Sequence, residues 1–290
     1  MTIKTILVAL SLEEDCAIVA SRAVQLADQH DAQLVGVHVI PSFDVFKLAP
    51  PLSVDLADLE RLVRDTAADK LSSMLEKARI PAIVAVETGA PHKAIGTLAA
   101  SHDVDLIVIG AGNAQGVREN VFGSTADRIV STSSRPILVA RDAAHIAYKQ
   151  IVVGTDFSEA SIAAAEFALR LAPSAARKLL HAVAIPPEFK QAMFSAGTAR
   201  NDVELYRQAI IDRAEKQIVE VFGGEGSVPY SVVAGPPAAV LLRASQEPET
   251  DLLALGTKGL GAIAEHLLGS VVRRVLAQSD CDVLAVPPSP

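Results

Sequence analysis

Glycines in the second half of the chain form a pattern that could hold a phosphate group. Gly256-Thr257-Lys258-Gly259 follows an apolar run, and Gly269-Ser270 comes after nine further residues, at the start of a helical pattern. Glycines let the backbone approach a ligand closely, and the free N–H groups of a helix N-terminus favour an anion. The pattern is not a P-loop, and glycines that only form turns would look the same.

A carboxylate follows another apolar run, in the segment Thr155-Asp156-Phe157-Ser158. If the run is a parallel strand, Asp156 stands at its carboxyl end, where open α/β sheets bind ligands. Asp156 could there accept hydrogen bonds from an exocyclic amine or a ribose. The alternative is that Asp156 or Ser158 only caps the next helix. Lys258 could screen phosphate charge, or it is a solvated loop lysine.

Other chemistry finds little support in the sequence. No His-x3-His or His-Glu-x-x-His spacing indicates a metal site, and no Gly-x-Ser-x-Gly or Gly-x-Gly-x-x-Gly motif occurs. Cys16 and Cys281 are too few for a disulfide framework, so we expect reduced thiols in or near the core. His38 and His181 fall in the second predicted strand of each half, two residues out of register, and are expected to pack there.

The chain is an internal duplication. TILVALSLEED at Thr5 matches QIVVGTDFSEA at Gln150, and LVGVHVIP at Leu34 matches LLHAVAIP at Leu179. DLIVIGAG at Asp105 matches DLLALGTK at Asp251 in the same way, at an offset of 145 or 146 residues. This steady offset predicts two copies of one domain, residues 1–143 and 148–290.

Each copy alternates short apolar runs with amphipathic stretches. In the second copy, Ser158 is the expected N-cap of the first helix and Pro173 its stop. Short apolar runs separated by helices predict an α/β fold, a five-stranded parallel-sheet sandwich with about four helices per copy, Rossmann-like. The predicted strands are residues 151–155, 179–185, 228–234, 252–255 and 282–286, and the predicted helices are 158–172, 199–222, 237–246 and 270–278.

Composition limits the partners. The chain has 26 Lys and Arg residues against 34 Asp and Glu residues, which gives a net charge of -8. This negative charge argues against nucleic-acid binding, because nucleic acids are themselves negatively charged. No apolar run is long enough to span a membrane, and no signal peptide is visible. We therefore expect a cytoplasmic protein.

Both copies resemble the universal stress protein domain, in tandem. The resemblance rests on TDFSE from Thr155, on LLHAVAI from Leu179 and on the spacing of Gly256, Gly259, Gly269 and Ser270. Motif-bearing members of that family bind ATP. The resemblance implies that Asp156 and the backbone of Val183 meet the adenine, that Gly154 and Gly256 border the ribose, and that Gly259, Gly269, Ser270 and Val271 hold the phosphates. Thr155 and Lys258 complete the expected set.

The first copy departs from the motif at two positions. Ser11 stands where the second copy has Asp156, and Asn113 stands where it has Gly259, whereas Gly110, Gly123 and Ser124 remain. We therefore expect one competent nucleotide site per chain, in the second copy. The first copy would bind ATP weakly, not at all, or hold another ligand.

Three functions stay open at this point. The preferred one is a nucleotide-binding stress-response regulator, in which ATP, with or without Mg²⁺, orders loop 257–269 and alters binding of an unknown protein partner. ADP or AMP could replace ATP. The alternatives are a slow ATP hydrolase and a nucleotide-independent interaction module. The resemblance also implies an intramolecular pseudo-dimer in which strands 136–140 and 282–286 pair, and a homodimer of whole chains is open.

Overall fold

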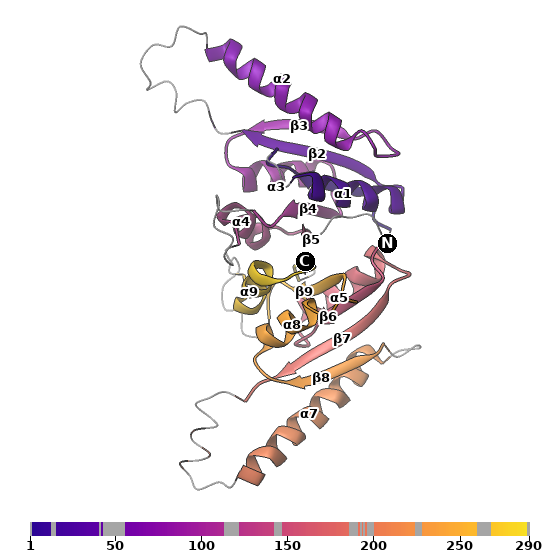
Figure 1. The fold of residues 1–290 in the computed structure, drawn as a ribbon, viewed down its shortest axis with the longest axis vertical. Coiled ribbons are helices and arrows are strands. Elements are labelled where there is room, and N and C mark those ends of the chain that lie inside the picture. Colours follow the sequence, from indigo (N-terminus) through magenta and orange to yellow (C-terminus); the bar gives the residue numbers. More distant parts are fainter. Residues whose placement is uncertain are drawn as a thin grey trace. The chain divides into compact units, whose positions relative to one another are not determined.

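The chain folds into two α/β units. This computed structural model describes residues 2–12, 16–40, 42, 56–112, 122–141, 147–185, 191, 193, 195, 200–223, 228–259 and 268–288. The chain divides into residues 1–147, called domain 1 below, and residues 148–290, called domain 2. Each is built on a parallel sheet with helices packed against it (Figure 1).

The two domains have the same order of elements. Domain 1 contains β1 (Thr5–Ala9), α1 (Cys16–His30), β2 (Gln33–Ile40), α2 (Leu56–Leu75), β3 (Ile83–Thr88), α3 (Pro91–Ser101), β4 (Leu106–Gly110), α4 (Ser124–Thr132) and β5 (Ile137–Ala140). Domain 2 contains β6 (Gln150–Gly154), α5 (Glu159–Leu171), β7 (Ala176–Val183), α7 (Arg200–Phe222), β8 (Tyr230–Ala234), α8 (Pro237–Ser245), β9 (Leu252–Gly256), α9 (Ser270–Gln278) and β10 (Asp282–Val286). The predicted five strands and four helices per copy are confirmed for the described residues.

The strand order creates a switch point in each sheet. The order is β3-β2-β1-β4-β5 in domain 1 and β8-β7-β6-β9-β10 in domain 2, with parallel pairing within each domain. The chain moves outward from the first strand, then returns to its other side. Because such crossovers are right-handed, the first two helices cover one face and the last two cover the other. The switch lies between β1 and β4 and between β6 and β9, where this architecture binds ligands.

Short apolar strands form because both sheet faces are covered. β4 and β10 are buried almost throughout, and a parallel strand buried on both faces needs a continuous apolar run.

One aspartate in each domain ties the start of the first strand to the start of the fourth. Asp105 Oδ2 accepts hydrogen bonds from the backbone N of Lys4 (2.7 Å) and Thr5 (3.1 Å). Asp251 Oδ2 does the same for the N of Lys149 and Gln150, at 2.6 and 2.8 Å.

The predicted register of the second strands is wrong by two residues. β1 pairs Thr5 with Gln33, whereas β6 pairs Gln150 with Ala176, so β7 comes two residues earlier than the sequence match of Leu34 with Leu179 implied. The cause is a shorter connection in domain 2, where β6 ends at Gly154 and β7 begins at Ala176, whereas β1 ends at Ala9 and β2 begins at Gln33. A slip of two residues keeps every side chain on its own sheet face, so the apolar pattern could not reveal it. His38 and His181 are therefore equivalent.

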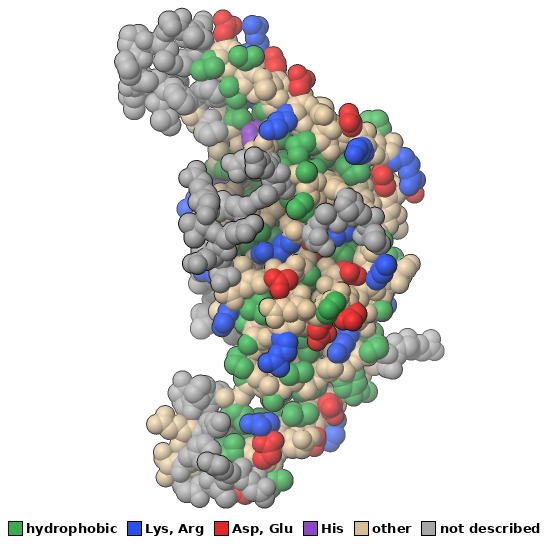
Figure 2. Space-filling view, viewed as in Figure 1, with side chains coloured by type: hydrophobic (Ala, Val, Ile, Leu, Met, Phe, Trp, Pro, Cys, Tyr) green, Lys and Arg blue, Asp and Glu red, His purple; other side chains and the backbone are tan. Residues whose placement is uncertain are grey.

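The outer helices carry mixed charge. Figure 2 shows acidic and basic side chains interspersed along α2, where Arg61 pairs with Asp58 at 3.3 Å and Arg64 with Glu60 at 3.4 Å. Such exposed pairs contribute about 0–1 kcal/mol each. In the part of the chain that the structure describes, no helix is both long and apolar enough to cross a membrane.

A buried polar pair stabilises domain 2. Tyr148 and Asp282 are 5% and 0% exposed, and the Tyr148 hydroxyl donates a hydrogen bond of 2.6 Å to Asp282 Oδ2. We expect Tyr148→Phe to lower the free energy of unfolding by about 1–3 kcal/mol, because a buried acceptor loses its donor. Urea unfolding followed by circular dichroism measures this. The control is Tyr230→Phe, which changes an exposed residue at the start of β8, and equal effects of the two changes would contradict the prediction.

Burial raises the pKa of the Cys281 thiol from 9.0 to about 11. Both cysteines are free and buried, as predicted. Between these two pKa values the unfolded chain loses the thiol proton while the folded chain keeps it, so stability falls as pH rises. The loss amounts to at most about 3 kcal/mol between pH 9 and 11. Cys281→Ala should flatten that part of the stability–pH curve; equal slopes for both proteins would contradict the assignment.

Candidate functional site

The two sequence motifs of domain 2 meet at its switch point. β6 and β9 are neighbours, so the segments after Gly154 and after Gly256 leave the same edge of the sheet. Asp156 and Gly259 lie in contact there, since a Cβ placed on Gly259 would be 2.6 Å from Asp156 Oδ2. The fold thus brings together the carboxylate and the glycine loop that the sequence singled out.

Ser158 joins these two segments by hydrogen bonds. Its hydroxyl donates to Asp156 Oδ1 at 2.5 Å and also lies 3.2 Å from the carbonyl oxygen of Lys258. Ser158 Oγ in turn accepts a hydrogen bond from the backbone N of Ser161 at 3.3 Å, which makes Ser158 the N-cap of α5, as predicted. Asp156 Oδ1 also accepts from the N of Ser158 at 3.1 Å, an Asx turn. The carboxylate is therefore fixed in a turn beside the cap and does not itself cap the helix.

A histidine supports the turn from the neighbouring strand. His181 Nδ1 lies 2.8 Å from the carbonyl oxygen of Thr155, and because a carbonyl only accepts, Nδ1 carries the proton. Its ring packs on Phe157, with centroids 4.7 Å apart, and Phe157 has a φ of 66°. Domain 1 repeats this arrangement, since His38 Nδ1 donates to the carbonyl oxygen of Leu10 at 2.7 Å and Leu12 has a φ of 64°. Sequence reasoning missed this role because it placed the two histidines out of register.

The start of α9 lies beside the loop after β9. Gly269 is the N-cap, with φ -57° and ψ 143°, and no side chain caps the helix. The Gly269 N donates to the carbonyl oxygen of Thr257 at 3.1 Å, which holds the helix start beside the loop after β9. Ser270 is the first helical residue and is exposed, so its side chain does not cap the helix. The N–H groups of an uncapped first turn suit an anion.

Several other predicted residues are engaged within the protein. A Cβ on Gly154 would meet the side chains of Leu255 (2.5 Å) and Leu241 (2.8 Å). A Cβ on Gly256 would lie 2.6 Å from the backbone of Ala160 and Ser161, so this glycine lets α5 approach β9. Both glycines are thus required by packing.

Thr155 and Val183 are buried at the same edge. The Thr155 hydroxyl accepts from the N of Phe157 at 3.1 Å and lies 3.2 Å from Ser161 Oγ, so it shapes the turn. The Val183 carbonyl accepts from the N of Gly235 at 2.8 Å. β7 runs three residues beyond the partner of Gly154, which places Val183 beside the site. Val271 is half-buried in the first turn of α9.

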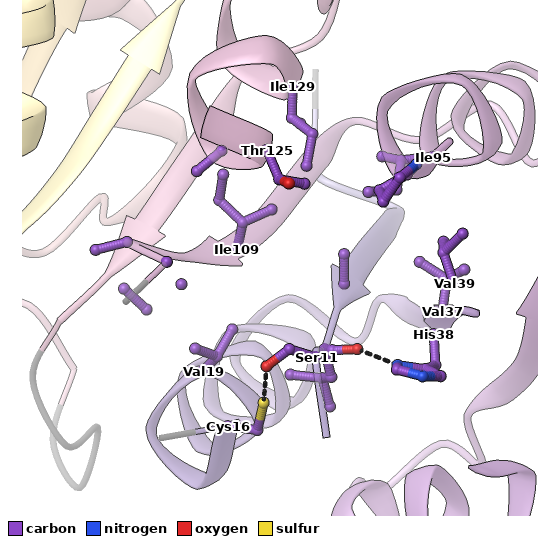
Figure 3. Close-up of a pocket in the computed structure, with 18 of the residues that line it drawn as sticks. Ser11, Cys16, Val19, Val37, His38, Val39, Ile95, Ile109, Thr125 and Ile129 are labelled. Carbon is purple, nitrogen blue, oxygen red and sulfur yellow. Dashed lines mark hydrogen bonds between the residues drawn. The ribbon is translucent and has the colours of Figure 1, made fainter. Parts of the chain in front are cut away.

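Domain 1 has a pocket at the corresponding place (Figure 3). It has a volume of about 600 Å³ and is lined by residues from the ends of β1, β2, β4 and β5 and from α1, α3 and α4. Ser11 Oγ and Cys16 Sγ, 3.1 Å apart, lie on one side of it, and Thr125 and Ile129 of α4 lie on another. The sequence predicted a degenerate nucleotide motif here, and a site that binds ATP weakly, not at all, or holds another ligand.

Part of the motif lies outside the described residues. Asn113 and residues 260–267 belong to that part, so the expected ordering of loop 257–269 is not tested. Among the described residues, no group of three or more His, Cys, Asp or Glu side chains could hold a metal ion.

Comparisons with known proteins agree with this fold. The model of the universal stress protein family matches residues 2–141 and 147–287. The universal stress protein Rv1636 of Mycobacterium tuberculosis is 33% identical over 144 residues, which are 48% of this chain and 97% of that protein. A universal stress protein structure from Archaeoglobus fulgidus DSM 4304 covers 98% of both chains with a TM-score of 0.68 and 18% identity, which shows the fold.

A universal stress protein solved in complex with cAMP is 32% identical and covers 50% of this chain and 100% of its own, with a TM-score of 0.33. The family model itself accounts for both halves of this chain. The chain therefore belongs to the universal stress protein family and carries two of its domains in tandem.

Proposed function

We propose that domain 2 binds an adenine nucleotide, ATP, and that this binding regulates a protein partner. The observation that supports the proposal most strongly is the contact of the Asp156 carboxylate with Gly259, next to the uncapped start of α9. A polar acceptor for the base or ribose and a helix start for the phosphates then lie at one switch point. Binding of an adenine nucleotide needs both groups.

Asp156 would recognise the base or the ribose. A carboxylate has about four acceptor positions, and Ser158 supplies two donors to Oδ1 alone. Oδ2 faces Gly259 on the opposite side of the group. Because Ser158 fixes the carboxylate before a ligand arrives, little conformational entropy is lost on binding.

The glycine segment and α9 would hold the phosphates. The N–H groups of Ser270 and Val271 point out of an uncapped first turn, and Gly269 brings no side chain between them and a ligand. Lys258 is half-buried in the loop after β9, where its positive charge would attract the negatively charged phosphate groups. Mg²⁺ would then be held through phosphate oxygens rather than by a protein cage.

Regulation requires that nucleotide and partner affect each other's affinity. A nucleotide shifts partner binding only if it binds two states of the protein with different affinity. The segments that surround the proposed phosphates, residues 257–259 and 268–271, contain exposed and half-buried residues beside buried ones. We therefore propose that a partner reads this edge of domain 2.

Calorimetric titration tests the binding. Wild-type protein should bind one ATP per chain. Asp156→Asn keeps the size of the side chain but removes its charge, and a lost hydrogen bond to a charged group should weaken binding by about tenfold or more. Gly259→Ala should weaken it similarly, because its Cβ would displace Asp156 Oδ2.

Two variants serve as controls for this titration. Asp280→Asn changes an exposed carboxylate beyond α9, and Gly96→Ala places a methyl group where nothing lies within 4 Å. Both should bind ATP as the wild type does. Unchanged affinity in Asp156→Asn and Gly259→Ala, or no ATP binding by the wild type, would refute the proposal.

Ser158→Ala tests whether the junction prepares the site. It removes the α5 cap, at a cost of about 0.5–2 kcal/mol in stability, and also removes the hydroxyl donor to Asp156 Oδ1 while the backbone donor remains. We expect weaker ATP binding than in Ser158→Thr, which keeps the hydroxyl. Urea unfolding and calorimetry on both variants separate the two effects, and equal ATP affinities would argue against a prepared site.

A further inference from the structure

The pocket of domain 1 differs in its lining from the candidate site of domain 2. It occupies about 600 Å³ at the switch point between β1 and β4, and its lining includes no Asp or Glu among the described residues. A pocket of this size suits a small organic molecule. Its chemistry follows from the side chains that replace those of domain 2.

Substitutions at equivalent positions change the charges around the site. Ser11 replaces Asp156, so the negative charge at the end of the first strand is absent. Arg141, which lines the pocket after β5, replaces Pro287, which follows β10. The equivalent of Lys258 is Gly112, so domain 2 carries one charge of each sign here and domain 1 carries a single positive charge.

The floor and walls of the pocket are apolar. Ile95 from α3, Ile109 from β4 and Val19 from α1 line it, and all three are buried (Figure 3). Leu10 and Cys16 stand where domain 2 has Thr155 and Ser161, whose hydroxyls bond to each other. At these positions the carbon frame of a ligand therefore meets carbon and sulfur atoms, and the two hydroxyls of domain 2 are absent.

The anion-binding groups gather at one end. Ala140 of β5 pairs with Gly110, so Arg141 follows the strand beside Ala111 and Gly112. A Cβ on Gly112 would lie 3.3 Å from the Cα of Gly123, the N-cap of α4. No side chain caps α4, and its second residue, Thr125, is exposed and lines the pocket.

Arg141 and the α4 start thus flank the Ala111–Gly112 segment at the mouth of an apolar cavity. A guanidinium has five N–H donors, so it can take an anion in addition to a protein partner. A carboxylate at this end would gain charge-assisted hydrogen bonds.

We propose that domain 1 binds a small organic anion with an apolar body, an acyl carboxylate, and excludes adenine nucleotides. The apolar body occupies the space between Val19, Ile95 and Ile109. The carboxylate lies between Arg141 and the first turn of α4. The tandem chain then carries two sites of one architecture with different ligands, one per domain.

Calorimetric titration with decanoate below its micelle concentration tests this proposal. The full chain, with ATP present throughout, should bind one decanoate. Arg141→Gln should weaken binding by about tenfold or more, because a charge-assisted contact is lost. Thr125→Trp should abolish it by filling the mouth of the pocket from an exposed position, so the fold is retained.

Matched controls use the same helix. Arg128→Gln and Thr132→Trp change exposed residues of α4 outside the pocket lining and should leave decanoate affinity unchanged. Decanol should bind at least about tenfold more weakly than decanoate, and decylamine more weakly still. Far-ultraviolet circular dichroism confirms that each variant is folded.

Three results would overturn the proposal. One is the absence of decanoate binding, and another is equal affinity for decanoate, decanol and decylamine. The third is ATP bound to domain 1, seen as a second ATP per chain that Thr125→Trp removes while Asp156→Asn does not. Loss of ATP binding in Asp156→Asn, with decanoate binding intact, would leave both proposals standing.

Discussion

The hydrogen bonds of Ser158 hold the edge of domain 2 together, because they link the turn after β6 to the loop after β9. One hydroxyl fixes the Asp156 carboxylate, meets the carbonyl of Lys258 and caps α5. Gly259 is compatible with this arrangement only because it has no Cβ. The proposed nucleotide site thus depends on a junction that the protein forms by itself, before any ligand is bound.

The same frame surrounds two different sets of side chains. In both domains an aspartate ties the first strand to the fourth at its start, and a histidine supports the turn at its end. These contacts keep the switch point fixed while the side chains around it differ. Where domain 2 places Asp156 and Thr155, domain 1 has Ser11 and Leu10, and the pocket becomes apolar. Duplication therefore provides a constant scaffold on which ligand preference can diverge.

Much of the fold could be predicted from the sequence, because buried parallel strands need apolar runs and the duplication repeats the signal. The N-cap at Ser158 and the start of α9 after Gly269 followed from local chemistry. The register of β7 did not, since a two-residue slip preserves the apolar pattern. The role of His181 depends on that register, and so it was missed.

The site was predicted only in part. The positions of Asp156 and Gly259 after predicted strands indicate that both belong to a site, but their contact depends on how β6 and β9 pair. Packing, which no sequence motif records, explains Gly154 and Gly256. The pocket of domain 1 comes from the summed shape of seven elements, so the substituted motif alone gave no sign of it. The pairing of the two domains as a pseudo-dimer stays a prediction.

The central claim is that domain 2, and not domain 1, holds the nucleotide. Photo-crosslinking with 8-azido-ATP, followed by mass spectrometry of the labelled peptides, tests it most directly. We expect labels on peptides that contain residues 154–185 or 256–272, removed by excess ATP and absent in Asp156→Asn. Labels on the peptides that contain His38 or Thr125 of domain 1, equally displaced by ATP, would contradict it.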